Sequence, residues 1–340
     1  MIAEQLPPLL YMLAAIAKRA VLVHRSLRLH LVKLTGTTRN GKSDTVIYYL
    51  GEMETLGYLK RLYFAEVCEQ PLDLFWLWEL REKLRDYSSS DDLVIVEANR
   101  FFDFHAPGGG FHTFPWIRQI ASMGPSVDGH RWKRIEDIYG RKVRQYQYRM
   151  DIRNDRTSVA QFYHDFYRPY IYYKYKNIAH VRDLQELILA ASKGFLMQVF
   201  EGDRWISGVI CIVRGGKLTI LAKGLLPDYE YHLKRGAMSA CDYFMFNWAR
   251  EHGMETVDFL RSRPHAEDGL FEYKRKWGAR AVRDVWPHTS LWVYLPKREL
   301  IPEEFKRQLV LDGQAFVELK TLHLQSHWQD KKRGLPGVDG

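Results

Sequence analysis

The sequence has few cysteines and no hydrophobic run long enough to cross a membrane. Its three cysteines, Cys68, Cys211 and Cys241, lie far apart and form no Cys-x-x-Cys pair. This spacing excludes a disulfide scaffold and a zinc site built from cysteines, and it is typical of a reducing compartment. A membrane-spanning helix needs about 18 consecutive apolar residues, which the sequence lacks. We therefore expect a cytoplasmic protein with no metal site.

The longest apolar stretch, Leu6 to Ala17, contains two prolines and ends at Lys18-Arg19. It lacks the leading positive charges of a signal peptide. We expect it to form a short helix covering the first sheet, with peripheral membrane contact as the alternative. The tail from Asp330 to Gly340 is expected to fray.

What the sequence does contain is a large core and a basic surplus. Its 340 residues are 46% hydrophobic and 27% charged, which favours two folded domains of roughly 150 residues each. The 50 basic and 41 acidic residues leave a net charge of +9. This surplus favours anionic partners, which include nucleic acid, phosphorylated cofactors and acidic membranes.

The first half of the chain mixes helix and strand patterns. Val21 to Leu34 alternates as a strand does, and Leu93 to Val96 is a short apolar run typical of a buried strand. Pro71 to Asp86 predicts a helix. A turn-rich segment, Pro107 to Gly129, is followed by a predicted basic helix from Arg131 to Met150.

The second half predicts an antiparallel meander of three strands followed by a helix, a strand, a helix and two strands. Gly253 stands where a helix stop favours glycine. The predicted elements after the meander are the helices Gly236–His252 and Gly269–Trp277 and the strands Thr256–Leu260, Ala281–Trp286 and Leu291–Tyr294. The meander strands are Phe195–Phe200, Trp205–Val213 and Lys217–Ala222.

This order of elements is that of the GNAT acyltransferase fold, and two motifs carry a closer resemblance. Asp258-Phe259-Leu260, followed by Gly269 and by Tyr273-Lys274-x-x-Trp277, resembles the signature of Fem-type peptidyltransferases and CelD-type acyltransferases. Phe162 to Tyr170 resembles a helix of the same group. The resemblance implies an α/β (α+β) fold of tandem GNAT-like domains: a degenerate domain at 1–152, a donor-binding domain at 153–300 and a helical extension at 301–340.

In that fold, the segment before the long helix binds the pyrophosphate of coenzyme A. Here the resemblance assigns this role to Lys234, Arg235, Gly236 and Ala237, while Leu233 stands where the family has Gln or Arg. Basic side chains and free helix N–H groups are suitable anion ligands. Solvated basic residues at a helix start are the alternative.

For catalysis, the resemblance implies that Lys274 faces the site, where it can stabilise the developing oxyanion or a donor phosphate. Asp258 is a candidate base, or the group that orients one, and Tyr273 is a candidate proton donor to the leaving thiolate. His265 is a candidate base on the acceptor side. The alternatives are a solvated basic face for Lys274, a turn cap for Asp258, a core ring for Tyr273 and an exposed loop position for His265.

The segment from Tyr163 to Lys176 combines tyrosines with basic residues, and Tyr167, Arg168 and Tyr170 are its candidate substrate contacts. Such a segment can stack on sugars or on an RNA end, or pack its rings inward. A second basic set is more typical of a solvated face, although it would suit phosphate contacts; it contains Arg141, Lys142, Arg144, Arg149, Arg153 and Arg156.

Gly36 to Ser43 matches the Walker A pattern of nucleotide-binding loops. However, Asn40-Gly41 is also a strong hairpin signal between two predicted strands. Too few βα units surround the match for a P-loop domain. We therefore predict a hairpin.

We predict an acyltransferase that moves an acyl group from acyl-coenzyme A to an amine or hydroxyl of a cell-envelope or glycan-type acceptor by direct attack. The scattered cysteines offer no Cys-His arrangement for a covalent intermediate. One alternative keeps the fold but uses an aminoacyl-tRNA donor. Another is a binding module whose site has decayed.

Overall fold

The structure is a computed structural model of the whole chain, and the description below covers most of it. The predicted helix at Leu6–Ala17 and the predicted fraying of the tail lie outside the described residues. No helix among the described residues is long and apolar enough to cross a membrane. The described residues are 27–53, 55–88, 92–99, 110–124, 129–176, 180–284, 289–295, 303–313 and 315–322.

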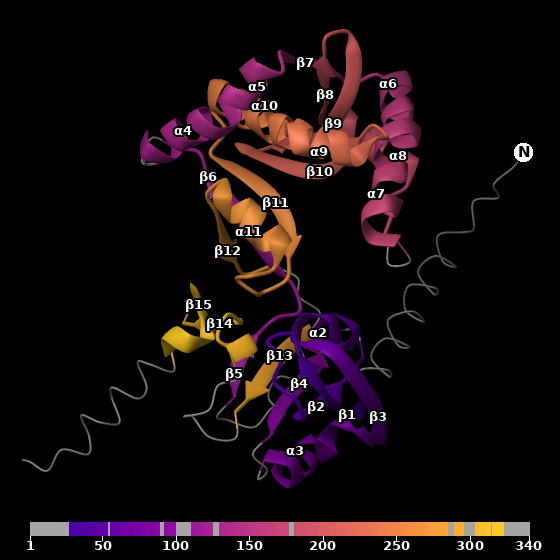
Figure 1. Ribbon diagram of the computed structural model, residues 1–340, viewed down its shortest axis with the longest axis vertical. Coiled ribbons are helices and arrows are strands. Elements are labelled where there is room, and N and C mark those ends of the chain that lie inside the picture. Colours follow the sequence, from indigo (N-terminus) through magenta and orange to yellow (C-terminus); the bar gives the residue numbers. More distant parts are fainter. Residues whose placement is uncertain are drawn as a thin grey trace, which may run out of the picture. The chain divides into compact units, whose positions relative to one another are not determined.

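The chain forms two compact units (Figure 1). Unit 1 contains residues 1–117, 263–268 and 283–340, and unit 2 contains residues 118–262 and 269–282. These boundaries differ from the predicted division at residue 152. The physical reason is strand pairing, because strands from each half of the sequence complete the sheet of the other unit.

Unit 1 is built on a six-stranded sheet in the order β3-β1-β2-β4-β13-β5. Helix α2 and helix α3 follow β2 and β3, and a short hairpin, β14 and β15, completes the unit. The bounds are β1 Arg28–Thr38, β2 Thr45–Gly51, α2 Leu56–Tyr63, β3 Phe64–Trp76, α3 Leu80–Ser88, β4 Leu93–Asn99, β5 Phe111–Thr113, β13 Thr289–Tyr294, β14 Leu309–Asp312 and β15 Ala315–Glu318, with 3-10 turns at Leu77–Glu79 and Glu303–Phe305.

The predicted hairpin at Asn40-Gly41 is confirmed. β1 and β2 pair antiparallel, and Gly41, in the left-handed region at φ 83°, donates its N–H to the Thr38 carbonyl at 2.9 Å. A P-loop requires a helix directly after its lysine. Here Lys42 is followed by strand β2, which starts at Thr45. Gly36–Ser43 is therefore not a P-loop.

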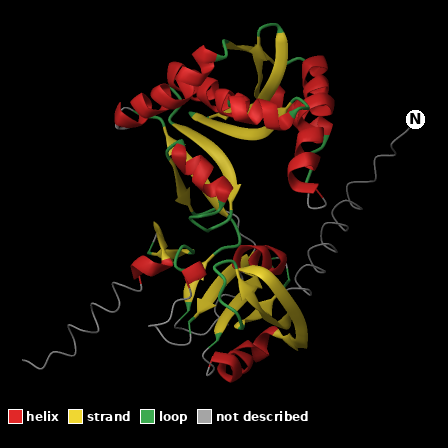
Figure 2. Ribbon diagram, in the orientation of Figure 1, coloured by secondary structure: helices red, strands yellow, loops and turns green. Residues whose placement is uncertain are grey.

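Unit 2 contains a seven-stranded sheet in the order β12-β6-β11-β10-β9-β8-β7. Its helices lie against both faces of this sheet (Figure 2). The bounds are β6 Ile117–Ser122, α4 Gly129–Ile135, α5 Arg141–Gln145, β7 Tyr148–Arg153, α6 Arg156–Gln161, α7 Arg168–Tyr175, α8 Leu184–Ser192, β8 Gly194–Glu201, β9 Arg204–Arg214, β10 Lys217–Leu225, α9 Tyr229–Arg235, α10 Ala237–Glu251, β11 Thr256–Ser262, α11 Gly269–Lys276 and β12 Ala279–Val282, with π-helical turns at Glu136–Gly140 and Phe162–Tyr167.

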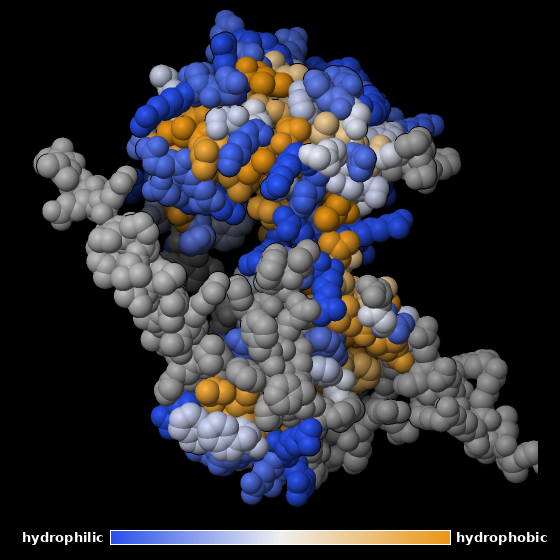
Figure 3. Space-filling view, turned by 180° about the vertical axis from the view of Figure 1, so that it is seen from behind, coloured by the Kyte–Doolittle hydropathy of each residue, from blue (hydrophilic) through white to orange (hydrophobic). Residues whose placement is uncertain are grey.

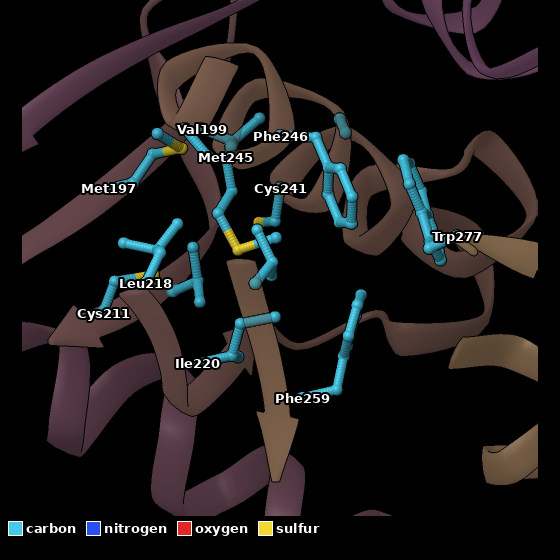
Figure 4. Close-up of a cluster of buried hydrophobic side chains, with 14 of the residues drawn as sticks. Met197, Val199, Cys211, Leu218, Ile220, Cys241, Met245, Phe246, Phe259 and Trp277 are labelled. Atoms are coloured by element: carbon cyan, nitrogen blue, oxygen red, sulfur yellow. The ribbon is translucent and has the colours of Figure 1, made fainter. Parts of the chain in front are cut away.

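The predicted meander is confirmed, since β8, β9 and β10 pair antiparallel in sequence order. Along each strand, successive side chains point to opposite faces of the sheet. One face packs against α10 through Met197, Val199, Cys211, Leu218 and Met245 (Figure 4). The other face packs against α6 and α8, with residues such as Leu196 and Ile210.

Figure 3 shows apolar and hydrophilic areas interspersed on one side of both units.

Three predictions in the first half were wrong or incomplete. The predicted helix at Pro71–Asp86 starts only at Leu80, because β3 continues as a strand to Trp76, which pairs with Arg28 of β1. The turn-rich segment contains β5 and β6. The predicted basic helix ends at Gln145, and β7 follows and pairs with β8.

Two strands complete the sheet of the other half. β6 comes from the first half of the sequence and pairs antiparallel with β12 in unit 2. β13 comes from the second half and pairs with β4 and β5 in unit 1. The sequence predicted β13 as the last strand of the second domain. Hydrophobic patterns identify strands but do not identify their partners.

Candidate active site

The sheet of unit 2 opens between two parallel strands. β10 and β11 are paired at their beginnings, and within these fully described strands the last pair is Thr219 opposite Asp258. β10 nevertheless runs on to Leu225 and β11 to Ser262. Figure 1 shows the two strands diverging. Their carboxyl ends are therefore separated by side chains rather than joined by backbone hydrogen bonds.

A buried polar cluster lies beyond the last pair. Asp242, on α10, is fully buried. It accepts hydrogen bonds from the Lys223 ammonium of β10 and from the Tyr273 hydroxyl of α11. Lys223 also lies 5.8 Å from the ring centroid of Phe259 on β11. The cluster therefore links both diverging strands with two helices.

The sequence interpretation missed Lys223 and Asp242. Asp242 directly follows Cys241 on the apolar face of the predicted helix. A carboxylate on a buried face needs a charged or hydrogen-bonding partner. That rule gives a signal for Asp242, but only the folded chain identifies Lys223 as its partner.

The Tyr273 hydroxyl points to Asp242. Burial, together with the neighbouring Asp242 carboxylate, raises the pKa of Tyr273 well above its usual value. Tyr273 therefore stays protonated and donates its hydrogen bond within the cluster.

Lys274 is buried, and its ammonium lies at the carboxyl end of β11. Its Nζ donates hydrogen bonds to the Arg261 carbonyl at 2.7 Å and to the Ser262 hydroxyl at 2.9 Å. Backbone pairing of β10 with β11 has ended before this point of β11. The side chain attaches α11 to the end of β11 and places a positive charge there.

Asp258 occupies the opposite, paired end of the opening. Its buried carboxylate accepts the Leu260 N–H at 2.9 Å. The other oxygen lies 2.7 Å from Arg118 Nε and 3.6 Å from Lys217 Nζ. With cations beside it, Asp258 is a charge-compensated carboxylate within strand β11.

The predicted pyrophosphate segment is mostly helical. Tyr229 to Arg235 form α9, and Gly236, at φ 83°, separates it from α10, which starts at Ala237. Gly236 donates to the Leu233 carbonyl at 3.0 Å and accepts the Ala240 N–H at 2.9 Å. The N–H groups of the first turn of α10 have no carbonyl of their own helix to bind.

Lys142 of α5 lies beside this helix start. Its Nζ is 3.7 Å from the point that a β-carbon on Gly236 would occupy. The sequence assigned Lys142 to a basic face that would also suit phosphate contacts, but did not place it at this helix start. The structure thus places an additional cation where anion binding was predicted.

The two predicted cations of this segment differ in their surroundings. Lys234 is exposed. Arg235 forms an ion pair with Glu201, and its guanidinium carbon lies 4.0 Å from the Tyr146 ring centroid. Arg235 is therefore held in a cluster that links α9 to the β8–β9 hairpin.

The predicted substrate contacts are spread over the two units. Tyr167 and Tyr170 are buried core rings in unit 2, while Arg168 lies over the exposed Tyr172 at 5.8 Å. His265 is buried in unit 1, where its Nδ1 accepts the Glu267 N–H at 3.3 Å. Lys274, Tyr273 and the start of α10 thus all belong to unit 2, whereas His265 belongs to unit 1.

The described cysteines of unit 2 are unsuited to nucleophilic catalysis. Cys211 and Cys241 are fully buried. Burial raises the pKa of the Cys241 thiol to about 12, so that little thiolate exists near neutral pH. Among the described residues, no three His, Cys, Asp or Glu side chains form a group that could hold a metal ion.

His232 of α9 is buried, and neither ring nitrogen has a hydrogen-bond partner among the described residues. Burial and, next, the charge of Arg204 lower its pKa below the usual value of 6.5. Between 6.5 and that lower pKa, the unfolded chain binds a proton that the folded chain excludes. The neutral ring therefore stabilises the fold less and less as the pH falls through this window.

We accordingly expect wild-type stability to fall below about pH 6.5, by up to about 1.4 kcal/mol per pH unit, and His232→Phe to flatten this slope. Thermal unfolding at several pH values between 7.5 and 5 measures this dependence of stability on pH. His164→Phe, at an exposed site, should leave the slope unchanged. Equal slopes for wild type and His232→Phe would contradict this assignment.

Residues 126–275 match the family model described as "Acetyltransferase (GNAT) domain". This confirms the resemblance for that part of the chain, which contains a GNAT-type acetyltransferase domain. No curated protein matches the chain.

The solved structures that match the chain share little sequence with it, and their TM-scores are below 0.5. L-PGS from Bacillus licheniformis is 12% identical, with a TM-score of 0.38 over 78% of this chain and 85% of its own. FemX is also 12% identical, with a TM-score of 0.38 over 78% of this chain and 88% of its own. A GCN5-related N-acetyltransferase from Sphaerobacter thermophilus is 11% identical, with a TM-score of 0.32 over 74% and 73%.

Proposed function

We propose that unit 2 transfers an acyl group from an acyl-coenzyme A thioester, which is supported by the match of residues 126–275 to the GNAT acetyltransferase model. The proposed acceptor is an amine or hydroxyl group of a cell-envelope or glycan-type molecule. The observation that carries the proposal is the start of α10, where Gly236 and Lys142 meet. It is combined with a sheet that opens between β10 and β11.

The donor's pyrophosphate would bind at the start of α10. A helix of 15 residues offers free N–H groups and a partial positive charge at this end. Lys142 adds a charge beside Gly236, and the exposed Lys234 precedes it by two residues. Gly236 and Ala237 present little side chain, so that phosphate oxygens can approach the backbone closely.

The thioester would then extend into the opening between the strands. Negative charge develops on its carbonyl oxygen as the acceptor attacks. Lys274, at the end of β11, is the proposed cation that stabilises this charge. Tyr273 and Asp242 would hold Lys223 in place across the opening. Asp258, predicted as a base or the group that orients one, would instead hold the two cations beside its carboxylate.

The reaction would be a direct transfer. The lone pair of the acceptor nitrogen or oxygen forms a bond to the carbonyl carbon, and the bond from that carbon to sulfur breaks. The thiolate of coenzyme A leaves, and the acceptor's proton passes to solvent. The burial of Cys211 and Cys241 supports a route without an acyl-cysteine intermediate.

An aminoacyl-tRNA donor is the second candidate. It is favoured by the outer side of α7, where Tyr172 and Tyr173 are nearly half exposed and Arg168 lies over Tyr172. Exposed aromatic and basic side chains can stack on unpaired bases and contact phosphates. Tyr167 and Tyr170 are buried, so these two predicted substrate contacts are not part of this surface.

Lys142→Ala should weaken acetyl-coenzyme A binding about tenfold, since it removes one charge-assisted contact to phosphate. Titration calorimetry measures the dissociation constant. Arg141→Ala is the matched control, because Arg141 is an exposed cation one residue away and should leave the affinity unchanged.

Equal affinities for wild type and Lys142→Ala would place the donor elsewhere. A protein that ignores coenzyme A esters and binds tRNA with a steep dependence on salt would support the second candidate instead.

A further inference from the structure

Unit 1 carries an exposed apolar surface that the proposed chemistry does not use. It consists of Leu72, Leu74, Trp76 and Trp78, at the end of β3 and in the turn after it, and is called the Trp surface below. Trp78 is 59% exposed, Leu74 42% and Leu72 39%. Contiguous exposed apolar groups of this kind mark interaction sites.

The two tryptophans form a rigid pair. Their rings stack with centroids 4.8 Å apart and an interplanar angle of 7°. The Arg28 guanidinium carbon lies 4.9 Å from the Trp76 ring centroid. Trp76 is thus held between a cation and a second ring, while Trp78 extends the stack toward solvent.

The strand that carries this surface is protected against pairing with another strand. β3 is the edge strand of its sheet, beside β1 (Figure 1). Pro71 lacks an N–H group, and the pairing register shifts opposite Leu72. Prolines and bulges at an edge prevent strand addition. A partner would therefore contact the side chains of the Trp surface and not the backbone of β3. This argues against a second copy of the chain that pairs with β3.

One cation, Arg28, accompanies the Trp surface. Arg28 and His30 pair with Trp76 and Leu74 across β1 and β3, so these four side chains share one face of the sheet. The neighbouring acids are engaged, because Asp73 pairs with Lys83 and Glu79 accepts the Trp76 N–H at 2.6 Å.

The sequence attached at this point is also basic and apolar. The described chain starts at Leu27, whose carbonyl accepts the Leu77 N–H at 2.8 Å beside the Trp surface. The first 43 residues contain seven Lys and Arg side chains but one acid, Glu4, together with the apolar stretch Leu6–Ala17. Basic stretches next to apolar and aromatic residues bind anionic lipid surfaces.

We propose that the Trp surface docks unit 1 onto an anionic phospholipid membrane. Tryptophan rings favour the boundary between headgroups and acyl chains. Leu72 and Leu74 would enter the apolar region, while Arg28 contacts lipid phosphates. Docking would hold the protein at the surface where envelope-type acceptors are found, but it is independent of the acyl donor.

Co-sedimentation of the full-length protein with vesicles tests the docking. Vesicles of equal parts phosphatidylglycerol and phosphatidylcholine should bind the wild type, and phosphatidylcholine alone should bind it much less. Trp78→Ala and Leu74→Ser should each lower the partition coefficient about tenfold. Leu189→Ser, at an apolar site of unit 2 that is 55% exposed, is the control and should bind as the wild type does.

Circular dichroism of each variant checks that it is folded. Three results would overturn the proposal: a wild type that stays in the supernatant with both kinds of vesicle, equal binding of the wild type to both, or full binding by Trp78→Ala. A Trp78-dependent binding of soluble oligosaccharides without vesicle binding would likewise overturn it and assign the surface to glycans.

Discussion

Replacing Asp242 by alanine should lower the free energy of unfolding by about 3–5 kcal/mol. Asp242 is fully buried, and its carboxylate accepts hydrogen bonds from both Lys223 and Tyr273. Its removal leaves the Lys223 ammonium without its counter-charge in a largely desolvated position. Urea unfolding followed by circular dichroism, read at the transition of unit 2, measures the loss.

Two controls separate the cluster from a general effect of substitution. Asp203→Ala removes a carboxylate from the β8–β9 turn, where the side chain is fully exposed, and should cost less than about 0.5 kcal/mol. The triple variant Lys223→Met, Asp242→Leu, Tyr273→Phe removes every polar member and should recover most of the stability. A stable Asp242→Ala protein would show that the cluster is not desolvated.

Lys274→Met should lower the turnover number by about a hundredfold, equivalent to about 3 kcal/mol of transition-state stabilisation. Methionine keeps the length and most of the volume of the side chain while removing its charge. The loss should fall on the turnover number, with the Michaelis constant for the acyl donor little changed, because the proposed oxyanion exists only in the transition state.

Lys276→Met is the matched control, since Lys276 lies on the same helix with its side chain 58% exposed and should retain full turnover. Lys274 also binds the Arg261 carbonyl and the Ser262 hydroxyl, so the thermal stability of Lys274→Met must be measured alongside. A folded Lys274→Met enzyme with normal turnover would remove Lys274 from the chemistry.

Local patterns in the second half of the sequence predicted the fold there well. The meander strands are short, mostly apolar runs bounded by glycine turns, so each strand is specified by residues next to it in the chain. Helix α10 was predicted to within a residue at each end because its apolar face repeats at helical spacing and Gly253 follows it.

The arrangement of the first half depends on contacts between distant residues, which local patterns do not specify. The segment Pro71–Asp86 was predicted as a helix, yet the pairing of β3 with β1 keeps its first part extended to Trp76. The exchange of β6 and β13 between the units likewise depends on which edges are left open when each sheet forms.

The candidate site was predicted in part for the same reason. Motif residues such as Lys274 and Gly236 can be identified from the residues next to them in the sequence. The partnership of Lys223 with Asp242, 19 residues apart, and the approach of Lys142 to Gly236 arise only when strands and helices pack. The roles of the motif residues remain proposals that the variants above test.

Thermal unfolding of the purified full-length protein with acetyl-coenzyme A tests the central claim most directly. A ligand at a hundred times its dissociation constant should add about 2.7 kcal/mol of stability. The account predicts a rise in melting temperature with acetyl-coenzyme A that is smaller for Lys142→Ala at the same concentration. No rise with any coenzyme A ester, together with a rise on adding tRNA, would contradict it.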